Sequence, residues 1–154
     1  MMLHVVLYQP EIPQNTGNVG RTCVALGARL WLVEPLGFRL DESRIRRAGL
    51  DYWQHLDCRQ VADWAALQRE LPSSRLWLLT KHAERDYTEA DFADGDALVF
   101  GSESRGLPQS LHETHRGERL RIPTDPRVRS LNLATAVGVV AYEARRQIMG
   151  RRSS

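Results

Sequence analysis

Three short segments of this chain carry residues that could bind a ligand or take part in a reaction. These residues are Asn15, Arg21, Gly101, Glu103, Gly106, Ser130 and Asn132. Gly101 and Gly106 bracket Glu103 in a loop that follows the apolar run 97–100. Glycine allows positive φ and a close approach of the backbone to a ligand, so this loop is a candidate binding site. A strand-to-helix turn that merely needs glycines has the same pattern, and both interpretations stay open at this point.

Several well-known ligand-binding patterns are missing from the sequence. There is no G-x-G-x-x-G, which argues against a Rossmann dinucleotide loop. Lys81 is the only lysine, and it does not lie in a phosphate-binding G-x-x-x-x-G-K-[ST] segment. Ser102 and Ser104 lie outside any G-x-S-x-G turn, so a hydrolase nucleophile is not indicated.

Metal and disulfide patterns are missing as well. Cys23 and Cys58 are too isolated to predict a disulfide framework or a zinc site. The segment from His112 to His115 does not match H-E-x-x-H, and we interpret it as part of a surface helix. We therefore expect no metal.

Length and composition predict one globular domain. The chain has 154 residues, of which 42% are hydrophobic and 26% charged; this suffices for one core and is too short for two ordinary domains. No apolar run approaches the ~20 residues of a membrane helix, and the N-terminus lacks a basic signal-peptide region. We expect a cytoplasmic protein with no membrane partner.

The basic residues are almost all arginines. The net charge is only +2, and 20 of the 21 basic residues are Arg. Codon bias in a GC-rich genome explains this most simply, although guanidinium groups also suit phosphate recognition. Two groups of arginines are candidate phosphate contacts. The first group is Arg44, Arg46 and Arg47. The second group is Arg116, Arg119, Arg121, Arg127 and Arg129.

Short apolar runs alternate with helical patterns, which predicts an α/β domain with a mostly parallel sheet flanked by helices. The predicted strands are 3–8, 30–33, 58–61, 76–80, 97–100 and 120–122. The predicted helices are 15–26, 41–47, 63–71, 107–114 and 130–148. Asn15 is a plausible N-cap of the first helix, and Gly27 lies at its C-terminal end. The domain should span residues 1–150, with a frayed tail at 151–154.

Segments 15–23, 100–108 and 130–137 resemble, in order and spacing, the three signature motifs of the SPOUT class of RNA methyltransferases. Segments 11–14 and 47–53 are similar to the TrmL (YibK-like) branch, which methylates the ribose 2′-oxygen of the anticodon wobble nucleotide, cytidine or uridine, in tRNA. The resemblance runs from about Leu3 to Met149. It implies a trefoil knot in the C-terminal part, S-adenosylmethionine as the methyl donor, tRNA as the partner, and a homodimer.

The resemblance also implies the site residues. Leu79, Gly101, Ile122 and Ser130 would bind the cofactor, and the turn after Thr80 has His82-Ala83 where a glycine is common. Arg21, Asn15, Glu103 and Asn132 would serve catalysis. Methyl transfer to a 2′-oxygen depends mainly on aligning two reactants. Arginine, with a pKa above ~12, is a poor base, so we interpret Arg21 as a donor that orients the ribose and stabilises negative charge. Glu103 could orient Arg21 or Asn132.

Two questions remain open from the sequence. The last predicted helix is rich in small residues, and Gly138 within it would favour close packing, either on the domain's own sheet or in a dimer interface. The second question is the substrate. A SPOUT enzyme acting on another RNA, or a knotted RNA-binding protein without activity, are the alternatives to wobble methylation.

Overall fold

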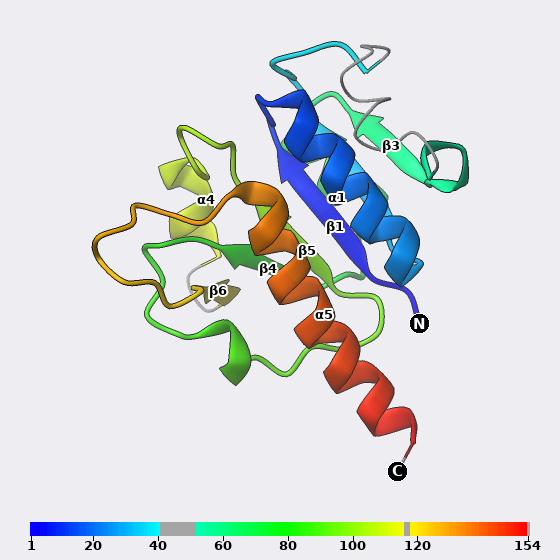
Figure 1. Ribbon diagram of the computed structural model, residues 1–154, viewed down its shortest axis with the longest axis vertical. Helices are drawn as coiled ribbons and strands as arrows, with labels where there is room; N and C mark the ends of the chain where they lie inside the picture. Colours follow the sequence, from blue (N-terminus) through cyan, green and yellow to red (C-terminus); the bar gives the residue numbers. More distant parts are fainter. Residues whose placement is uncertain (41–51, 116–117, 154) are drawn as a thin grey trace.

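The computed structural model describes residues 1–40, 52–115 and 118–153. In this part of the chain six strands form one sheet in the order β3-β2-β1-β5-β4-β6, and all the pairings are parallel (Figure 1). The predicted α/β class with a mostly parallel sheet is therefore confirmed. Because parallel neighbours point the same way, the carboxyl ends of all six strands lie at one edge.

The strands lie close to their predicted positions. They are β1 (His4–Tyr8), β2 (Arg29–Val33), β3 (Cys58–Val61), β4 (Leu76–Leu79), β5 (Ala97–Phe100) and β6 (Arg119–Leu120). β5 is buried along its whole length, as its continuous apolar run predicts for a central parallel strand. β6 is shorter than predicted and pairs only with β4, so Ile122 lies in the loop that follows the strand.

The helices are α1 (Pro13–Leu26), α3 (Trp64–Glu70), α4 (Gln109–Thr114) and α5 (Leu133–Arg152), with short 3₁₀ turns η1 (Trp53–His55) and η2 (Tyr87–Glu89). Asp63 caps α3 by accepting a hydrogen bond from Ala66 N. Gly27 ends α1 in the left-handed conformation, as predicted. The prediction that Asn15 caps α1 is wrong. Pro13 occupies the first turn, where its fixed φ suits a helix start, and Asn15 is buried inside the helix.

Two helical layers cover the sheet. α1 and α5 pack side by side on one face, over alternate strand residues such as Val5, Leu7 and Leu98 (Figure 1). α3 and α4 cover the other face, where Leu67 and Leu111 pack against a second set of strand residues. Both faces of the sheet are thus buried, which explains why its strands are apolar runs instead of alternating patterns.

The C-terminal helix is longer than predicted. α5 continues through Arg152, where the sequence suggested a frayed tail from residue 151. Arg151 donates to the carbonyl of Phe92, and Arg152 pairs with Asp94. These contacts hold the last turn of α5 against the loop 92–94. Because this loop is far from α5 along the chain, local sequence patterns do not reveal the contacts.

Some predictions fall on residues 41–51, 116–117 and 154, outside the described part of the chain. They concern the helix 41–47, the group of Arg44, Arg46 and Arg47, the first five residues of segment 47–53, Arg116 and the end of the tail. Of the helices in the described part of the chain, none combines the length and apolar character that a membrane span requires.

Candidate active site at the carboxyl edge of the sheet

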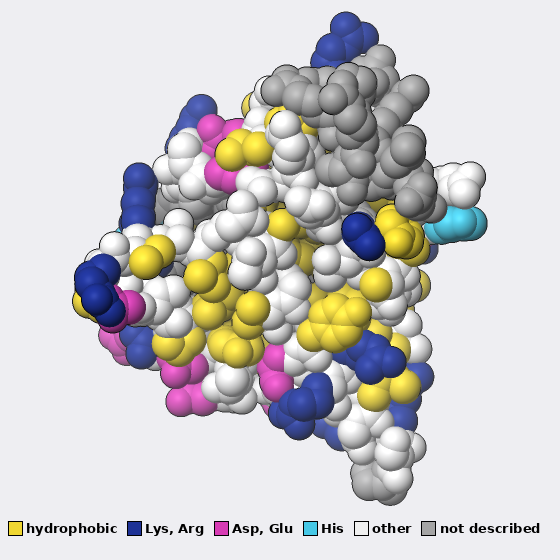
Figure 2. Space-filling view, viewed as in Figure 1, with side chains coloured by type: hydrophobic (Ala, Val, Ile, Leu, Met, Phe, Trp, Pro, Cys, Tyr) yellow, Lys and Arg dark blue, Asp and Glu magenta, His cyan; other side chains and the backbone are white. Residues whose placement is uncertain are grey.

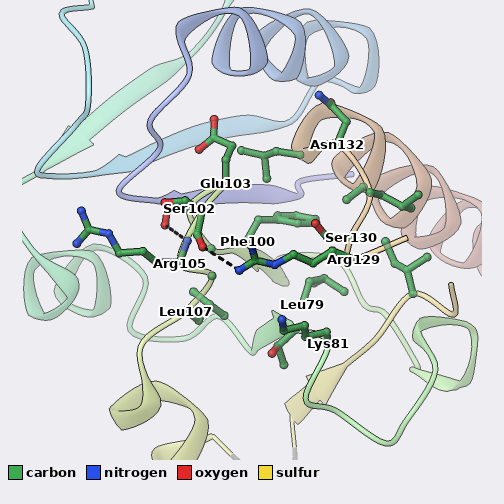
Figure 3. Close-up of a pocket in the computed structure, with 18 of the residues that line it drawn as sticks. Leu79, Lys81, Phe100, Ser102, Glu103, Arg105, Leu107, Arg129, Ser130 and Asn132 are labelled. Carbon is green, nitrogen blue, oxygen red and sulfur yellow. Dashed lines mark hydrogen bonds between the residues drawn. The ribbon is translucent and has the colours of Figure 1, made fainter. Parts of the chain in front are cut away.

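A cavity of about 420 Å³ lies where β4, β5 and β6 end, beside the N-termini of α1 and α5. This is the expected place for a ligand in a parallel α/β sheet, and the volume falls in the ~300–1,000 Å³ range of small-molecule sites. Its lining includes all four residues expected to bind a cofactor, namely Leu79, Gly101, Ile122 and Ser130 (Figure 3). The tertiary structure therefore brings these residues together from three separate loops.

Glycine is required in the loop after β5. A Cβ on Gly101 would lie 2.2 Å from the carbonyl carbon of Gly106 and 2.4 Å from Leu107 N, and backbone atoms cannot yield to such a contact. Gly106 has φ +67°, and its N–H donates to Ser102 O at 2.9 Å. Close backbone approach thus explains Gly101, and the left-handed conformation explains Gly106.

A chain of hydrogen bonds joins the three segments that hold the expected catalytic residues. Asn132 Nδ2 donates to Asn15 Oδ1 at 3.0 Å, and Asn15 Nδ2 donates to Glu103 Oε2 at 3.2 Å. Asn132 also caps α5 through its Oδ1, which accepts from Ala134 N and Thr135 N. Asn15 is only 7% exposed, so both of its amide atoms are satisfied away from water.

Glu103 lies at the N-terminus of α1. Its carboxylate accepts from Glu11 N at 2.8 Å and from Ile12 N at 2.9 Å. It thereby satisfies N–H groups just before the helix, where negative charge is favourable. Of the two partners suggested from sequence, Asn132 is reached through Asn15. Among the described residues, no hydrogen bond or ion pair joins Glu103 to Arg21.

A second contact joins the loop 101–106 to the segment before α1, and here the carboxylate belongs to that segment. Glu11 accepts hydrogen bonds from Ser104 N at 2.9 Å and from Ser104 Oγ at 2.7 Å. These bonds lower the pKa of Glu11, so its carboxylate is charged at neutral pH. Each segment thus supplies a carboxylate to the other, and the loop 101–106 is held at the start of α1.

Arg129 lines the cavity, and its contact there was not assigned from the sequence. It extends from the loop before α5 toward the loop 101–106, where Nη2 donates to Ser104 O at 3.4 Å (Figure 3). Other arginines of its sequence group are engaged by acids: Arg121 pairs with Asp86 at 2.8 Å and Arg127 with Asp125 at 2.9 Å. Of the members of this group that the structure describes, Arg129 is the one that lines the cavity.

Arg21 is not part of this cavity. It lies on the exposed surface of α1, where Nη2 donates to Tyr52 Oη at 3.2 Å and the guanidinium lies 4.6 Å from the centre of the Tyr52 ring. Six residues along an α-helix correspond to one and two-thirds turns, so Arg21 and Asn15 face different directions. Within one chain, the structure separates Arg21 from the other expected catalytic residues.

Trp53 packs against α1. A Cβ on Gly20 would come within 3.4 Å of its ring and 3.0 Å of the Leu56 side chain. The segment that follows the undescribed residues is therefore seated closely on α1.

His112 is the residue most clearly misread from sequence. We expected it on a surface helix, but it is 5% exposed and lines the cavity. Its Nε2 lies 2.8 Å from Thr80 Oγ1. Burial, with His82 and Arg119 nearby, lowers the pKa of His112, so the ring is neutral at pH 7. Neighbouring helix positions point about 100° apart, so the helical period did not group His112 with the buried Leu111, and the type of residue suggested solvent.

The two thiols and the possible metal ligands have no evident role at this site. Burial raises the pKa of both Cys23 and Cys58 to about 12, which makes them unreactive thiols at neutral pH. Within residues 1–40, 52–115 and 118–153, no group of three or more His, Cys, Asp or Glu side chains could hold a metal ion.

The fold and the cavity define an α/β protein with a ligand site built from three loops at the carboxyl edge of a parallel sheet. The sequence pattern of the SpoU rRNA Methylase family matches residues 2–142. This chain belongs to that family, and it is therefore an RNA methyltransferase by descent.

Individual relatives are similar over almost the whole chain. A tRNA (cytidine(34)-2′-O)-methyltransferase of Acidovorax sp. (strain JS42) is 49% identical over 149 residues, covering 95% of this chain and 92% of the relative. A solved structure concerned with the 2-OH methylation of C/U34 on tRNA superposes with a TM-score of 0.92 and 54% identity, covering 97% of this chain and 98% of the other. An AdoMet-bound rRNA methyltransferase from Sinorhizobium meliloti superposes with a TM-score of 0.85 and 28% identity, covering 94% of this chain and 56% of the other.

Proposed function

We propose that this protein transfers a methyl group from S-adenosylmethionine to the ribose 2′-oxygen of the wobble nucleotide, cytidine or modified uridine, in a tRNA anticodon. The observation that carries the proposal is the cavity in which the three motif segments meet, closed on one side by the Asn132–Asn15–Glu103 hydrogen bonds. Similarity over nearly the whole length to relatives named for position 34 of tRNA supports the choice of substrate.

The cavity suits S-adenosylmethionine. Leu79, Phe100 and Ile122 line it with apolar surface, and Gly101 permits the backbone approach that such a ligand needs. When bound, the cofactor supplies a methyl group on a positively charged sulfur. No step of the transfer calls for a metal ion.

The residues of this chain would mainly align the reactants. Asn132 is held by Asn15 and Glu103, so its side chain is pre-oriented at the cavity. Arg21 would donate to the ribose 2′-oxygen and stabilise its developing negative charge. Because Arg21 cannot serve as a base at neutral pH, a phosphate oxygen of the RNA would accept the proton.

We infer that the active enzyme is a homodimer, because Arg21 does not line the cavity of its own chain. A second copy would bring its Arg21 to this cavity. Exposed apolar side chains on α5 and just before the N-termini of α1 and α5 support such an interface: Ile12, Leu131, Tyr142 and Met149 are each at least 36% exposed. Figure 2, which views this face, shows hydrophobic side chains gathered on it.

Gly138 also supports a dimer interface on this face. A Cβ there would meet nothing within 4 Å in the described part of the chain, so packing on the protein's own sheet does not explain a glycine in mid-helix. A helix glycine costs ~1 kcal/mol relative to alanine. Close approach of a second copy would account for it.

Two finer features complete the proposal. The C-terminal part would form a trefoil knot, which is consistent with a chain that leaves the edge strand β6 and returns to pack α5 against α1 (Figure 1). An experimental density map that is continuous over residues 76–152 would test the knot. The protein would act in the cytoplasm, where its tRNA substrate is found.

One other substrate has specific support. The family is described by rRNA methylation, and the Sinorhizobium meliloti relative is an rRNA methyltransferase. The smaller identity and the partial coverage of that relative make it the weaker guide. A knotted RNA-binding protein without activity is disfavoured, because Asn15, Glu103 and Asn132 are joined at the cavity.

Mass spectrometry of nucleosides separates these possibilities. tRNA and rRNA from a strain that lacks the gene should be compared with RNA from the parent strain. We expect 2′-O-methylation to be lost from the wobble position and kept in rRNA, and a plasmid-borne copy should restore it. Loss from rRNA alone would contradict the tRNA assignment. Calorimetry in EDTA should show S-adenosylmethionine binding to the purified protein, and no heat at millimolar ligand would overturn the cofactor assignment.

A further inference from the structure

Thr80 and the buried His112 form a partly buried contact at the wall of the cavity. Thr80 follows β4 directly, and His112 lies on α4, which covers the opposite face of the sheet from α1 and α5. The Thr80 hydroxyl and His112 Nε2 are 2.8 Å apart, and the imidazole is 5% exposed. Both residues line the cavity, so their contact lies between its wall and the core.

The Thr80 hydroxyl is also engaged within its own turn. Its oxygen accepts from His82 N at 3.2 Å, while Ala83 N donates to Thr80 O at 3.3 Å to close the turn. With one lone pair occupied by His82 N–H, the hydroxyl can donate its proton to an unprotonated Nε2 of His112. A single side chain thus shapes the turn and ties it to α4.

This turn has no glycine to set its shape. Residues 80–83 are Thr-Lys-His-Ala, and the backbone is anchored on the other side by Thr80 N, which donates to Leu120 O at 2.9 Å. Thr80, Lys81 and His82 all line the cavity. Three contacts therefore hold this part of the cavity wall: the backbone bond to β6, the bond from the Thr80 side chain to His112, and the edge-on packing of the His82 ring on the His112 ring, whose centroids are 5.4 Å apart.

We propose that Thr80 and His112 are a positioning pair, which holds the 80–83 turn in the conformation that binds the cofactor. The proposal rests on the proposed function, because it assigns the cavity to S-adenosylmethionine. Neither residue needs to touch the reacting atoms. Loss of their hydrogen bond should free the turn and weaken cofactor binding, and restoring a hydrogen-bonding group should recover it.

Paired substitutions test this directly. Thr80→Val removes the hydroxyl at nearly constant shape, and Thr80→Ser keeps it; His112→Leu removes the polar group, and His112→Gln places an amide near the position of Nε2. We expect Thr80→Val and His112→Leu each to raise the Kd of S-adenosylhomocysteine about tenfold, with Thr80→Ser and His112→Gln recovering most of the loss. The double variant, which combines Thr80→Val with His112→Leu, should bind no more weakly than His112→Leu alone, because the hydrogen bond is already lost in that single variant.

A matched control lies on α4 itself. Thr114→Val removes a hydroxyl that donates to Ser110 O at 2.8 Å, outside the cavity, and should leave the Kd unchanged. Turnover assays should show KM for the cofactor rising by a larger factor than kcat falls. Thermal melting identifies variants that fail to fold. If His112→Leu is one of them, the comparison of Thr80→Val with Thr80→Ser tests by itself whether the hydrogen bond matters for cofactor binding.

The outcomes separate this inference from the proposed function. If the wild type binds the cofactor and Thr80→Val binds it equally well, the positioning pair is wrong and the methyltransferase assignment stands. Equal weakening in Thr80→Ser and Thr80→Val would show that packing matters and not the hydrogen bond. If the wild type itself does not bind, the cofactor assignment fails and the inference fails with it.

Discussion

Asn132 Nδ2 donates a hydrogen bond to Asn15 Oδ1 across 117 positions of sequence, at a distance of 3.0 Å. This bond joins the N-terminal ends of α1 and α5, the two helices that pack together on one face of the sheet. Since Asn15 also donates to Glu103, the bond links all three motif segments.

Replacing Asn15 by Asp should disrupt this arrangement. Asp keeps the acceptor for Asn132 but loses the donor to Glu103, and it places two carboxylates in contact. We expect kcat/KM to fall at least tenfold and the free energy of unfolding to fall by ~1–3 kcal/mol, the cost of an unsatisfied buried polar group. Asn18→Asp, the same change on the exposed side of α1, is the control. Wild-type stability and activity in Asn15→Asp would contradict the role of the bond.

Arg21→Ala should abolish methyl transfer while sparing cofactor binding, because Arg21 lies outside the cavity that would hold the cofactor. Single-turnover assays and calorimetry measure the two effects separately. Loss of cofactor binding would instead indicate a structural role, and near-normal turnover would rule out the catalytic one.

Tyr52 should affect the rate of methyl transfer because it positions Arg21. Tyr52→Phe removes the 3.2 Å hydrogen bond but keeps the ring beneath the guanidinium, so kcat should fall only a fewfold, whereas Tyr52→Ala removes both contacts and should cost more. Single-turnover assays of the two variants measure both effects. Equal losses in Tyr52→Phe and Tyr52→Ala would show that the ring beneath the guanidinium does not contribute.

Gly138→Glu should cost activity together with dimerisation. Glutamate suits a helix better than glycine, and the site is open in one chain, so the fold of the monomer should be kept. Sedimentation beside a methylation assay measures both properties. Gly150→Glu, a like change at an exposed position on α5, is the control. A wild type that is monomeric at micromolar concentration and fully active would rule out the dimer.

Gly101→Ala should destroy the cavity. The added Cβ would meet backbone atoms of Gly106 and Leu107, so the loop must move, and we expect S-adenosylhomocysteine binding to become undetectable by calorimetry. Gly150→Ala, where a Cβ meets nothing within 4 Å in the described structure, should be neutral or stabilising by up to ~1 kcal/mol. Normal binding by Gly101→Ala would contradict the assignment of this loop.

Acid should destabilise the protein through His4. Burial, with the positive charge of Arg29 and Arg59, lowers its pKa below 6.5, and Trp31 Nε1 donates to its Nδ1 at 3.0 Å. Well above pH 6.5 the ring is neutral in both folded and unfolded chains, so it adds no pH dependence there. Below pH 6.5 the unfolded chain gains the proton first, and stability falls as pH falls. Melting temperatures from pH 7.5 to 5.5 should fall less steeply for His4→Asn, and identical slopes would contradict this account.

Much of the local structure could be predicted from the sequence. The run 97–100 forms the fully buried β5 as its apolar composition predicted, Asp63 begins α3, and Gly27 ends α1. These features depend on side-chain type and on neighbours within a few positions, which a sequence records directly. Leu79, Gly101 and Ile122, which we expected to bind the cofactor, line one cavity, since the ends of parallel strands meet at one edge.

Only the tertiary structure decided how the polar residues are used. Asn15 has the residue type of a helix cap, but it bridges Glu103 and Asn132; Arg21 shares its motif yet faces away; His112 is buried against Thr80. Each outcome depends on contacts between residues more than thirty positions apart, and on which side of a helix faces the sheet. Spacing along the chain determines local conformation, whereas the partner of a buried polar group is determined by the packing of whole elements.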